Sequence, residues 1–247
     1  MKEEIIYGLN PVLETLRGTR RAFELFIAAT ATDKRLEKLL KLSAEKGVPV
    51  RQRDKADLSR ICGTDHHQGV ALRVEGFSYA EIGDILNRCR ESGENGLLII
   101  LDGIQDPHNL GAIIRSAACA GANGVIIPKD RAARITPTVE KASAGAVETI
   151  PIAQVVNIAQ TIEDLKKEGF WIYGAADTAP AGLFDQDLTG NTALVIGNEG
   201  EGIRPLVRKK CDATFSIPMR GGVSSLNASV AAGITLFEAV RQRTAKK

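Results

Sequence analysis

The sequence predicts an α/β protein made of a small N-terminal module and a larger domain with a mostly parallel sheet. Short apolar runs alternate with segments whose apolar residues recur at helical spacing along most of the chain. Between the two parts lies an acidic, helix-like stretch that ends in Ser92-Gly93-Glu94-Asn95-Gly96. Hydrophobic residues make up 44% and charged residues 25% of the 247 residues, as is typical of globular proteins. The chain is therefore long enough for two folded domains.

The first module is expected over residues 1–76. Asn10-Pro11 ahead of Val12 and Leu16 predicts a helix start, because Asn caps helix N-termini and Pro is favoured at the first helical position. Further helices are expected at 33–46 and 54–61, and strands at 22–29, 48–50 and 68–74. Basic residues slightly outnumber acidic ones in this module, which permits RNA binding without requiring it.

Residues 77–95 are expected to form a linker, and residues 96–247 the second domain. The run Leu97–Leu101 is apolar throughout, as in strands that are covered on both faces. Further strands are expected at 124–128, 170–176, 193–197 and 214–218, and helices at 110–120, 158–167 and 225–242. Ligands of parallel sheets bind beyond the carboxyl ends of the strands, so the candidate site residues are those that follow these runs.

Features that the sequence lacks exclude several classes of protein. The cysteines form no C-x-x-C pair, and His66-His67 has no partners at metal-ligand spacing, so no metal site is expected. No apolar run approaches the roughly 20 residues of a membrane span, and the N-terminus lacks the apolar core of a signal peptide. We therefore expect a cytoplasmic protein with no membrane partner. The net charge of +2 indicates no partner by itself.

The first candidate segment runs from Asp102 to Arg115, out of a buried strand, through Asp106-Pro107 and into a helix near Asn109. Asn109 is expected at the mouth of that helix, where free backbone N–H groups favour anions. Arg115 offers a planar fork of donors that suits phosphate. Taken alone, the segment is also explained as a helix cap followed by a surface arginine.

The second candidate segment is Gly197-Asn198-Glu199-Gly200-Glu201-Gly202, directly after an apolar strand. Its glycines allow positive φ and a close approach of the backbone to a ligand, and Glu199 can accept hydrogen bonds there. A flexible turn with solvated acids is the alternative interpretation. The spacing differs from the G-x-G-x-x-G that binds dinucleotides, and the turn after the first strand lacks that fingerprint too. A Rossmann-type oxidoreductase is therefore rejected.

The third candidate segment begins at Ile217-Pro218-Met219 and crosses a glycine loop to reach Ser225-Leu226-Asn227. Ser224 or Ser225 is a plausible cap for the helix that follows, which would make this part structural. The same stretch also places polar side chains beside the free amides of a helix start. Small residues at 228–233 indicate either tight core packing or an interface between subunits.

The three segments together resemble a known family. N-x-x-x-x-x-R at 109–115, G-N-E-G-x-G at 197–202 and I-P-M-x-G-x-x-S-S-L-N-x-S at 217–229 are similar to the three motifs of the SpoU (TrmH-like) RNA ribose 2′-O-methyltransferases of the SPOUT superfamily. The resemblance covers the chain from about residue 96 onward. Residues 5–75 look like the RNA substrate-binding domain of that family, which has an L30e/L7Ae-like α/β fold.

The resemblance implies a fold, a cofactor and a set of site residues. It implies a SPOUT-type parallel sheet with a trefoil knot in the C-terminal domain, a homodimer, and S-adenosylmethionine as cofactor with no metal. The implied cofactor-binding residues are Gly197, Ile217 and Leu226. The residues implied to act in catalysis or to position the substrate are Asn109, Arg115, Glu199, Ser225 and Asn227.

The two-domain layout is similar to that of family members that methylate a guanosine ribose in 23S ribosomal RNA, which is the RNA partner that we expect. Family members with this layout also act on other rRNA sites, and the tRNA enzymes of the family usually lack the N-terminal domain. Another rRNA site and tRNA remain alternative substrates. A non-catalytic RNA-binding protein for ribosome assembly, built on the same fold, is a further alternative. Methyl transfer from a sulfonium requires the ribose oxygen to be oriented, and orientation can supply several of the roughly 7–11 kcal/mol available from well-placed reactants.

Overall fold

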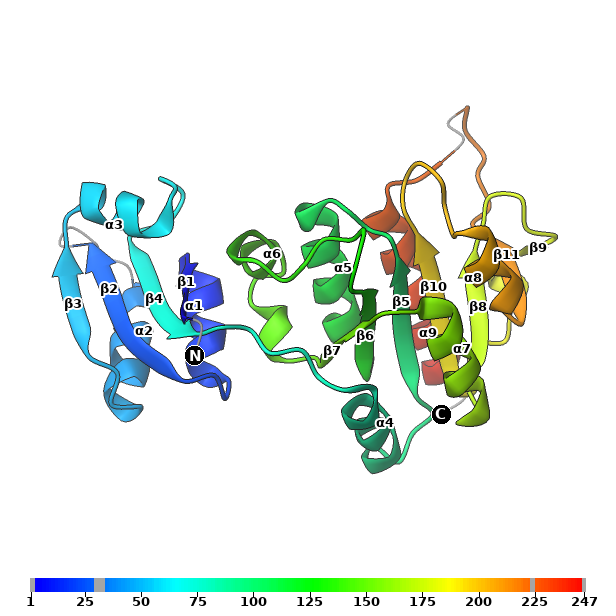
Figure 1. Cartoon of the computed structure of the whole chain (residues 1–247), viewed down its shortest axis with the longest axis horizontal. Coiled ribbons are helices and arrows are strands. Elements are labelled where there is room, and N and C mark those ends of the chain that lie inside the picture. The colour runs from blue at the N-terminus through cyan, green and yellow to red at the C-terminus, as the bar shows by residue number, and fades with distance from the viewer. Residues whose placement is uncertain (1–2, 29–33, 223–224, 246–247) are drawn as a thin grey trace. The chain divides into compact units, whose positions relative to one another are not determined.

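The computed structural model describes residues 3–28, 34–222 and 225–245. The chain divides into two compact units (Figure 1). Unit 1 contains Met1–Ser78 and Ile135–Thr149, and unit 2 contains Tyr79–Arg134 and Ile150–Lys247. This division differs from the expected segments 1–76, 77–95 and 96–247 in two places. Residues 135–149 pack in unit 1, and the expected linker contributes a helix to unit 2.

Unit 1 is built on a four-stranded sheet in the order β1-β4-β2-β3. The strand β4 pairs antiparallel with β1 and β2, and β2 pairs parallel with β3. The apolar sides of α1 and α2 cover one face, where Val12, Leu16 and Leu39 pack in one core with Leu25 and Leu72. The elements of unit 1 are β1 (Glu3–Tyr7), α1 (Leu9–Arg17), β2 (Ala22–Ala28), α2 (Lys34–Glu45), β3 (Val50–Arg53), α3 (Lys55–Cys62), β4 (Val70–Glu75), α6 (Pro137–Ala142) and the 3-10 helix η1 (Ala146–Glu148).

The first helix begins differently from the sequence expectation. The helix α1 starts at Leu9 behind Gly8, whose φ of 96° favours glycine, so Asn10 lies inside the first turn and the expectation that it caps the helix is wrong. The side chain of Gln68 accepts a hydrogen bond from the Leu9 backbone N–H at 2.9 Å instead. A residue distant in the sequence has taken the role of the local cap, because β4 brings its start beside this helix.

An ion cluster around Arg20 binds the inserted segment 135–149 to the rest of unit 1. The guanidinium contacts Glu140 Oε1 at 2.6 Å, Glu148 Oε1 at 2.8 Å and Glu4 Oε2 at 3.1 Å. Only 2% of the Glu140 side chain is exposed, and its Oε2 atom has no hydrogen-bond partner among the described residues. Burial, opposed by Arg20 and reinforced by repulsion from Glu148 and Glu4, raises the pKa of Glu140 to about 7.

We expect this shift to make the stability of unit 1 depend on pH. A carboxyl whose pKa rises from 4.5 to about 7 on folding contributes stability that is present below pH 4.5 and lost as the pH rises through 7. The Glu140→Gln variant should therefore lose less stability than the unchanged protein over this range, measured by chemical unfolding at several pH values. The exposed Glu91→Gln is the control. Parallel curves of unfolding free energy against pH for the unchanged protein and Glu140→Gln would contradict the prediction.

Unit 2 contains a seven-stranded sheet in the order β7-β6-β5-β10-β8-β11-β9, and all its ladders are parallel. Its elements are α4 (Ile82–Glu91), β5 (Leu97–Asp102), α5 (Pro107–Cys119), β6 (Gly124–Pro128), β7 (Ile152–Val155), α7 (Ile158–Lys167), β8 (Trp171–Ala175), β9 (Ala181–Gly182), η2 (Leu183–Asp185), β10 (Thr192–Gly197), α8 (Pro205–Lys210), β11 (Ala213–Ser216) and α9 (Ala228–Ala245).

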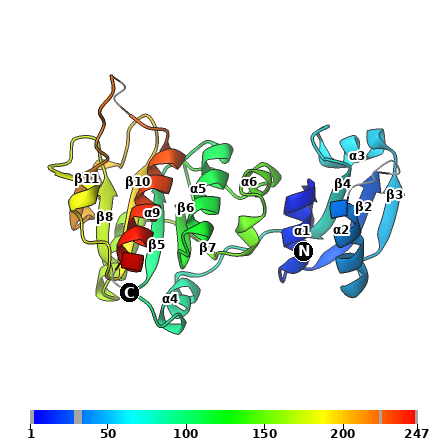
Figure 2. The same cartoon turned by 180° about the vertical axis from the view of Figure 1, so that it is seen from behind.

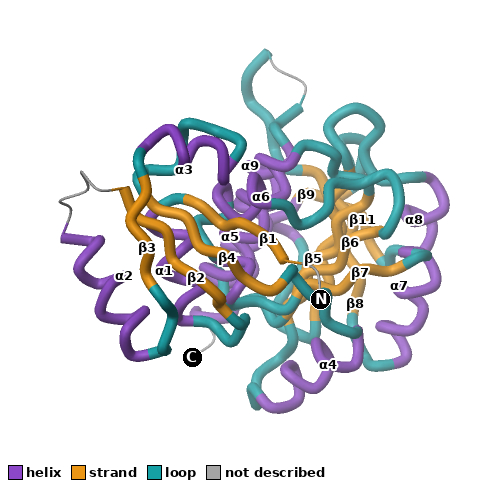
Figure 3. The backbone as a smooth tube through the Cα atoms, turned by 60° about the vertical axis from the view of Figure 1, so that its left-hand side comes forward, coloured by secondary structure: helices purple, strands orange, loops and turns teal. Residues whose placement is uncertain are grey.

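The sheet of unit 2 is covered on both faces, which explains its uniformly apolar strands. Figure 1 shows α7 and α8 in front of the sheet, and Figure 2 shows α9 in front of the opposite face. All six residues of β5 are buried. Figure 3 shows the strands of both sheets in orange and the helices in purple. The expected parallel α/β domain is confirmed, whereas the threading of the expected knot stays a prediction. No helix among the described residues is long and apolar enough to span a membrane.

The helix α4 packs in the core of unit 2, although its sequence resembles a polar linker. Ile85 and Cys89 are buried in the same cluster as Leu98 and Ile126. A Cβ atom on Gly124 would lie 2.6 Å from Ile85 Cγ2, so β6 starts with the residue that leaves room for this helix. Ile82 and Leu86 pack against the same cluster and are partly buried, so the apolar residues of α4 recur at helical spacing. The charged residues on the rest of this helix explain why the sequence pattern indicated a linker.

Replacing Ile85 with alanine tests whether α4 stabilises unit 2. We expect the variant to lose about 2–5 kcal/mol of unfolding free energy, because it leaves a cavity between α4 and β6. Denaturant unfolding monitored by circular dichroism measures the loss. The exposed Glu91→Ala on the same helix is the control and should change stability by less than about 0.5 kcal/mol. A loss of the same small size in Ile85→Ala would contradict the packing role.

Candidate functional site

The loop after β10 folds back on its own start. A Cβ atom on Gly197 would lie 2.0 Å from the Gly202 carbonyl carbon and 2.3 Å from the Ile203 nitrogen. These separations exclude any side chain at this position. The Gly202 N–H also donates to the Asn198 carbonyl at 3.0 Å, which closes the loop. The loop 197–203, called the glycine loop below, is therefore held in a single tight turn at the carboxyl edge of the sheet.

The side chain of Asn198 fixes the interior of the glycine loop. Its Oδ1 atom accepts hydrogen bonds from the backbone N–H groups of Gly200 at 3.0 Å and Glu201 at 2.7 Å. Sequence analysis did not single out Asn198 as a site residue. The signal was present, since an asparagine before a glycine-rich turn commonly bonds to the backbone two or three residues later.

An ion pair between a buried carboxylate and an exposed arginine ties the end of the glycine loop to the neighbouring strand. Asp102, the last residue of β5, is fully buried, and it accepts hydrogen bonds from the backbone N and the Nε of Arg204, both at 2.8 Å. The Arg204 Nη2 atom approaches the same carboxylate at 2.6 Å. Sequence analysis missed Arg204. The sequence does carry a signal for a basic partner of Asp102, because a carboxylate at the end of a fully apolar strand is buried and a buried charge requires a charged partner.

Three of the expected site residues form one chain of side-chain hydrogen bonds. The Asn109 Nδ2 atom donates to Glu199 Oε1 on the glycine loop. The Asn109 Oδ1 atom accepts from Asn227 Nδ2 at 2.9 Å. Asn227 Oδ1 in turn accepts from the backbone N–H of Ser229 at 2.9 Å and from its hydroxyl at 2.6 Å. Because each amide both donates and accepts, the chain fixes the orientation of all three side chains.

Both helices that border the site begin at residues other than those expected. The helix α5 is capped by Asp106, whose side chain accepts from the His108 backbone N–H at 2.9 Å, so Asn109 is not the cap. The helix α9 starts at Ala228, and Asn227 accepts hydrogen bonds from its first turn. The interpretation of Ser225 as the cap is therefore wrong, and Ser224 lies outside the described residues.

A cavity of about 280 Å³ opens where the glycine loop meets the segment that precedes α9. Its lining includes the expected cofactor-binding residues Gly197, Ile217 and Leu226, together with Glu199 and Ser225. Residues 175–178, at the end of β8 and directly after it, line the cavity as well. Five of the eight expected site residues thus come from distant parts of the sequence to one cavity, whereas Asn109, Arg115 and Asn227 are not part of its lining.

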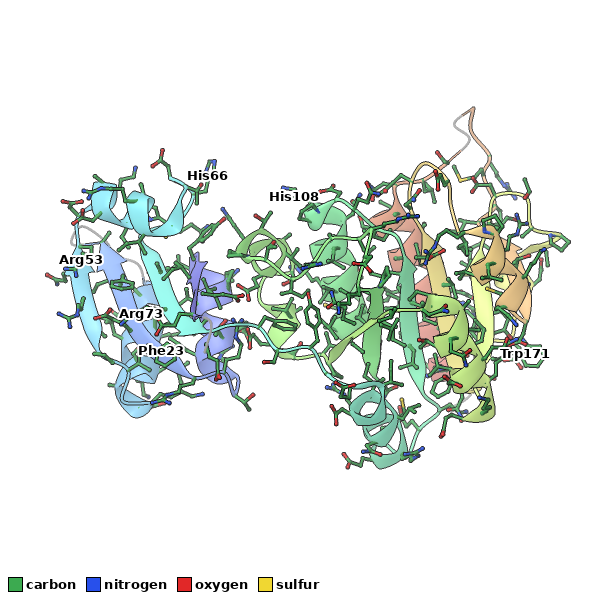
Figure 4. All side chains as sticks on the ribbon, viewed as in Figure 1. Phe23, Arg53, His66, Arg73, His108 and Trp171 are labelled. Atoms are coloured by element: carbon green, nitrogen blue, oxygen red, sulfur yellow. The ribbon has the colours of Figure 1, made fainter. Side chains whose placement is uncertain are left out.

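Arg115 remains outside this hydrogen-bonded chain. It lies on α5, is exposed, and makes no hydrogen bond or ion pair with any described residue. Figure 4 labels His108, which marks the start of the helix α5 that carries Arg115. An exposed guanidinium without an acidic partner is free to bind an anionic ligand.

A larger cavity of about 960 Å³ lies at the opposite, amino edge of the sheet. Its polar groups bond mainly to the protein itself: Asn191 Oδ1 accepts from Gly96 N at 2.6 Å, and Arg243 donates to the Gly96 carbonyl at 3.0 Å. None of the expected site residues lines it. The smaller cavity is the candidate site, because loops at the carboxyl edge of the sheet line it together with five of the expected site residues.

Gly197→Ala tests the tight turn. We expect a marked fall in the melting temperature, because the new methyl group overlaps the 202–203 backbone and the loop cannot close. Differential scanning calorimetry measures the change. The control is Gly200→Ala, whose new Cβ would have no atom closer than 3.7 Å. Equal melting temperatures for both variants would show that the close approach is unimportant.

Comparison with known proteins identifies the family of the chain. Residues 96–237 match the SpoU rRNA Methylase family, and residues 5–80 match the family of RNA 2′-O ribose methyltransferase substrate-binding domains. The chain therefore belongs to the SpoU rRNA methylase family.

Among curated proteins, the chain is 44% identical to the 23S rRNA (guanosine-2′-O-)-methyltransferase RlmB of Xylella fastidiosa, over 98% of both chains. It is also 44% identical to the RlmB of Ralstonia nicotianae, over 98% of this chain and 97% of that one. The SpoU methyltransferase AviRb from Streptomyces viridochromogenes, solved in complex with AdoMet, is 28% identical with a TM-score of 0.83 and covers 98% of this chain and 91% of its own. An AdoMet-bound rRNA methyltransferase from Sinorhizobium meliloti is 27% identical with a TM-score of 0.80, over 97% and 87%.

Proposed function

We propose that this protein transfers a methyl group from S-adenosylmethionine to the ribose 2′-hydroxyl of a guanosine in 23S ribosomal RNA. The observation that carries the proposal is the hydrogen-bonded chain from Glu199 through Asn109 to Asn227 beside the cavity, in a chain 44% identical to RlmB over 98% of its length. The AdoMet complexes of AviRb and the Sinorhizobium meliloti enzyme support the choice of cofactor. We place the protein in the cytoplasm, where ribosomal RNA is found.

The residues around the cavity suit S-adenosylmethionine. The cavity is lined by backbone and apolar groups, and its acidic side chains Asp177, Glu199 and Glu201 outnumber its one basic residue, Arg208. Acidic surroundings favour a ligand that carries positive sulfonium and ammonium groups. Gly197, Ile217 and Leu226 would hold the cofactor, which when bound supplies an electrophilic methyl group. Among the described residues, no group of His, Cys, Asp or Glu could hold a metal ion.

The chain's own side chains orient the ribose and bind the RNA next to it. Asn109 and Asn227 are fixed by their mutual hydrogen bond, and Glu199 anchors them to the glycine loop. Ser225 also lines the cavity, and its hydroxyl can hydrogen-bond to the sugar. Arg115 binds a phosphate as a cation, because a guanidinium stays protonated in proteins and is a poor base. Orientation of the 2′-hydroxyl is the main contribution of these residues to the rate.

Replacing Arg115 with lysine tests whether Arg115 binds an RNA phosphate through its planar guanidinium group. The variant keeps the charge but loses the planar fork, so we expect turnover to fall about ten- to a hundred-fold, which corresponds to one lost charge-assisted hydrogen bond. Initial rates with tritiated S-adenosylmethionine and unmodified 23S rRNA measure the effect. Cofactor affinity, measured by calorimetry, should be unchanged, and Arg90→Lys at the amino edge is the control. Near-normal turnover in Arg115→Lys would exclude a role for the planar guanidinium group in phosphate binding.

One experiment tests the proposed reaction and its alternatives. The protein is incubated with labelled cofactor and either unmodified 23S rRNA or unmodified tRNA, and the modified ribose is located by its resistance to alkaline cleavage. We expect one guanosine of 23S rRNA to be protected. Protection of a tRNA nucleotide would replace the ribosomal substrate with the tRNA alternative. RNA binding without any methyl transfer would favour the non-catalytic ribosome-assembly role.

We also propose that the protein is a homodimer formed through α9. Val230 and Phe237 on this helix are 48% and 49% exposed, although both are apolar. The small residues Ala231 and Gly233 in the same helix would let a second backbone approach closely. Analytical ultracentrifugation would measure the association, and Phe237→Glu should weaken it.

A further inference from the structure

Many basic side chains of unit 2 make ion pairs within the unit. Examples at the amino edge of the sheet are Arg90, 2.7 Å from Glu168, Lys167, 2.7 Å from Asp164, and Lys210, 3.2 Å from Glu163. The loop 129–134, called the basic loop below, is different. Its three cations are exposed and make no hydrogen bond or ion pair with any described residue; they are Lys129, Arg131 and Arg134.

The basic loop lies against the candidate site. It follows β6 at the carboxyl edge of the sheet, and the Ala133 N–H donates to the Ile104 carbonyl at 2.8 Å, in the loop after β5. A Cβ atom on Gly103 would lie 3.8 Å from the Arg131 carbonyl oxygen and 3.7 Å from Asn198 Nδ2. The basic loop and the glycine loop therefore both lie next to Gly103.

The backbone of the basic loop is held in a defined shape. The Lys129 N–H continues the β6–β7 ladder by donating to the Val155 carbonyl at 2.8 Å. Arg131 has a φ of 57°, in the left-handed region that residues other than glycine rarely adopt. Anchors at both ends and a fixed turn between them allow the loop to present its cations in one arrangement. Asp130 is the one acidic residue of the loop, so its charge remains positive.

We propose that Lys129, Arg131 and Arg134 form a phosphate-binding surface that holds the sugar–phosphate backbone of the substrate RNA on the side of the site next to β6. This proposal rests on the proposed function. Exposed cations without acidic partners release counterions from a polyanion, which makes phosphate the chemistry that fits them. Contacts to phosphates set the position of an RNA strand without specifying its sequence. The basic loop would thereby place the nucleotides next to the target ribose.

Salt-dependent RNA binding tests the surface. In the loop variant, the three cations of the basic loop are changed to glutamine, and in the matched control the amino-edge cations Arg90, Lys167 and Lys210 are changed to glutamine. Filter binding of a radiolabelled, unmodified 23S rRNA transcript is measured at several KCl concentrations. We expect the loop variant to bind RNA about ten-fold or more weakly. The negative slope of log K against log salt should become shallower by about 2, because each of three lost phosphate contacts contributes about 0.7 to its magnitude. The control should keep the slope of the unchanged protein.

Further measurements separate the surface from folding and from catalysis. Arg131→Lys/Arg134→Lys keeps the charges and should bind RNA like the unchanged protein, which shows that the charge rather than the loop shape matters. Calorimetry with S-adenosylmethionine should give the same affinity for the loop variant and the control. Equal salt slopes for these two variants, or displacement of the RNA from the loop by polyglutamate as readily as by polyuridylate, would overturn the proposal. If the unchanged protein transferred no methyl group, but the salt slope of its RNA binding still fell in the loop variant, only the proposed function would be overturned.

Discussion

The site depends on the contact between the backbone of Gly197 and the peptide that joins Gly202 to Ile203. This contact turns the chain back at the end of β10 and leaves Glu199 at the tip of the turn. The Asp102–Arg204 pair then holds the exit of the turn on the neighbouring strand β5. A buried carboxylate that keeps two charge-assisted hydrogen bonds strongly restricts the movement of the loop. Both constraints hold the glycine loop from which Glu199 bonds to Asn109.

Several polar groups serve the fold and the site at once. Asn227 bonds to the first turn of α9 and to Asn109, so the same side chain starts a helix and positions a neighbour. Asp106 caps α5, which leaves Asn109 free to bond to Glu199. Networks in which each donor and acceptor is used are rigid, and rigid side chains orient a substrate at lower entropic cost. The site is therefore organised by the ends of the same helices that cover the sheet.

The connection between the two units involves more than one segment. The chain passes from unit 1 to unit 2 after Ser78, returns to unit 1 at Ile135 and re-enters unit 2 at Ile150. The excursion begins directly after the basic loop and is held in unit 1 by the buried cluster of Arg20, Glu140 and Glu148. The strands β6 and β7, which are neighbours in the sheet of unit 2, are thus joined through a segment that folds with the other unit.

The sequence by itself determined the α/β class, the apolar strands of the parallel sheet and the three segments that supply the site. These features follow from local periodicity and from glycine-rich turns, which a short stretch of chain can specify. The tertiary structure decided which polar groups meet: Gln68 at the start of α1, Arg204 on Asp102, and Asn227 on Asn109. It also decided that α4 and residues 135–149 join different units. These pairings depend on contacts between residues far apart in the chain, which no local pattern records.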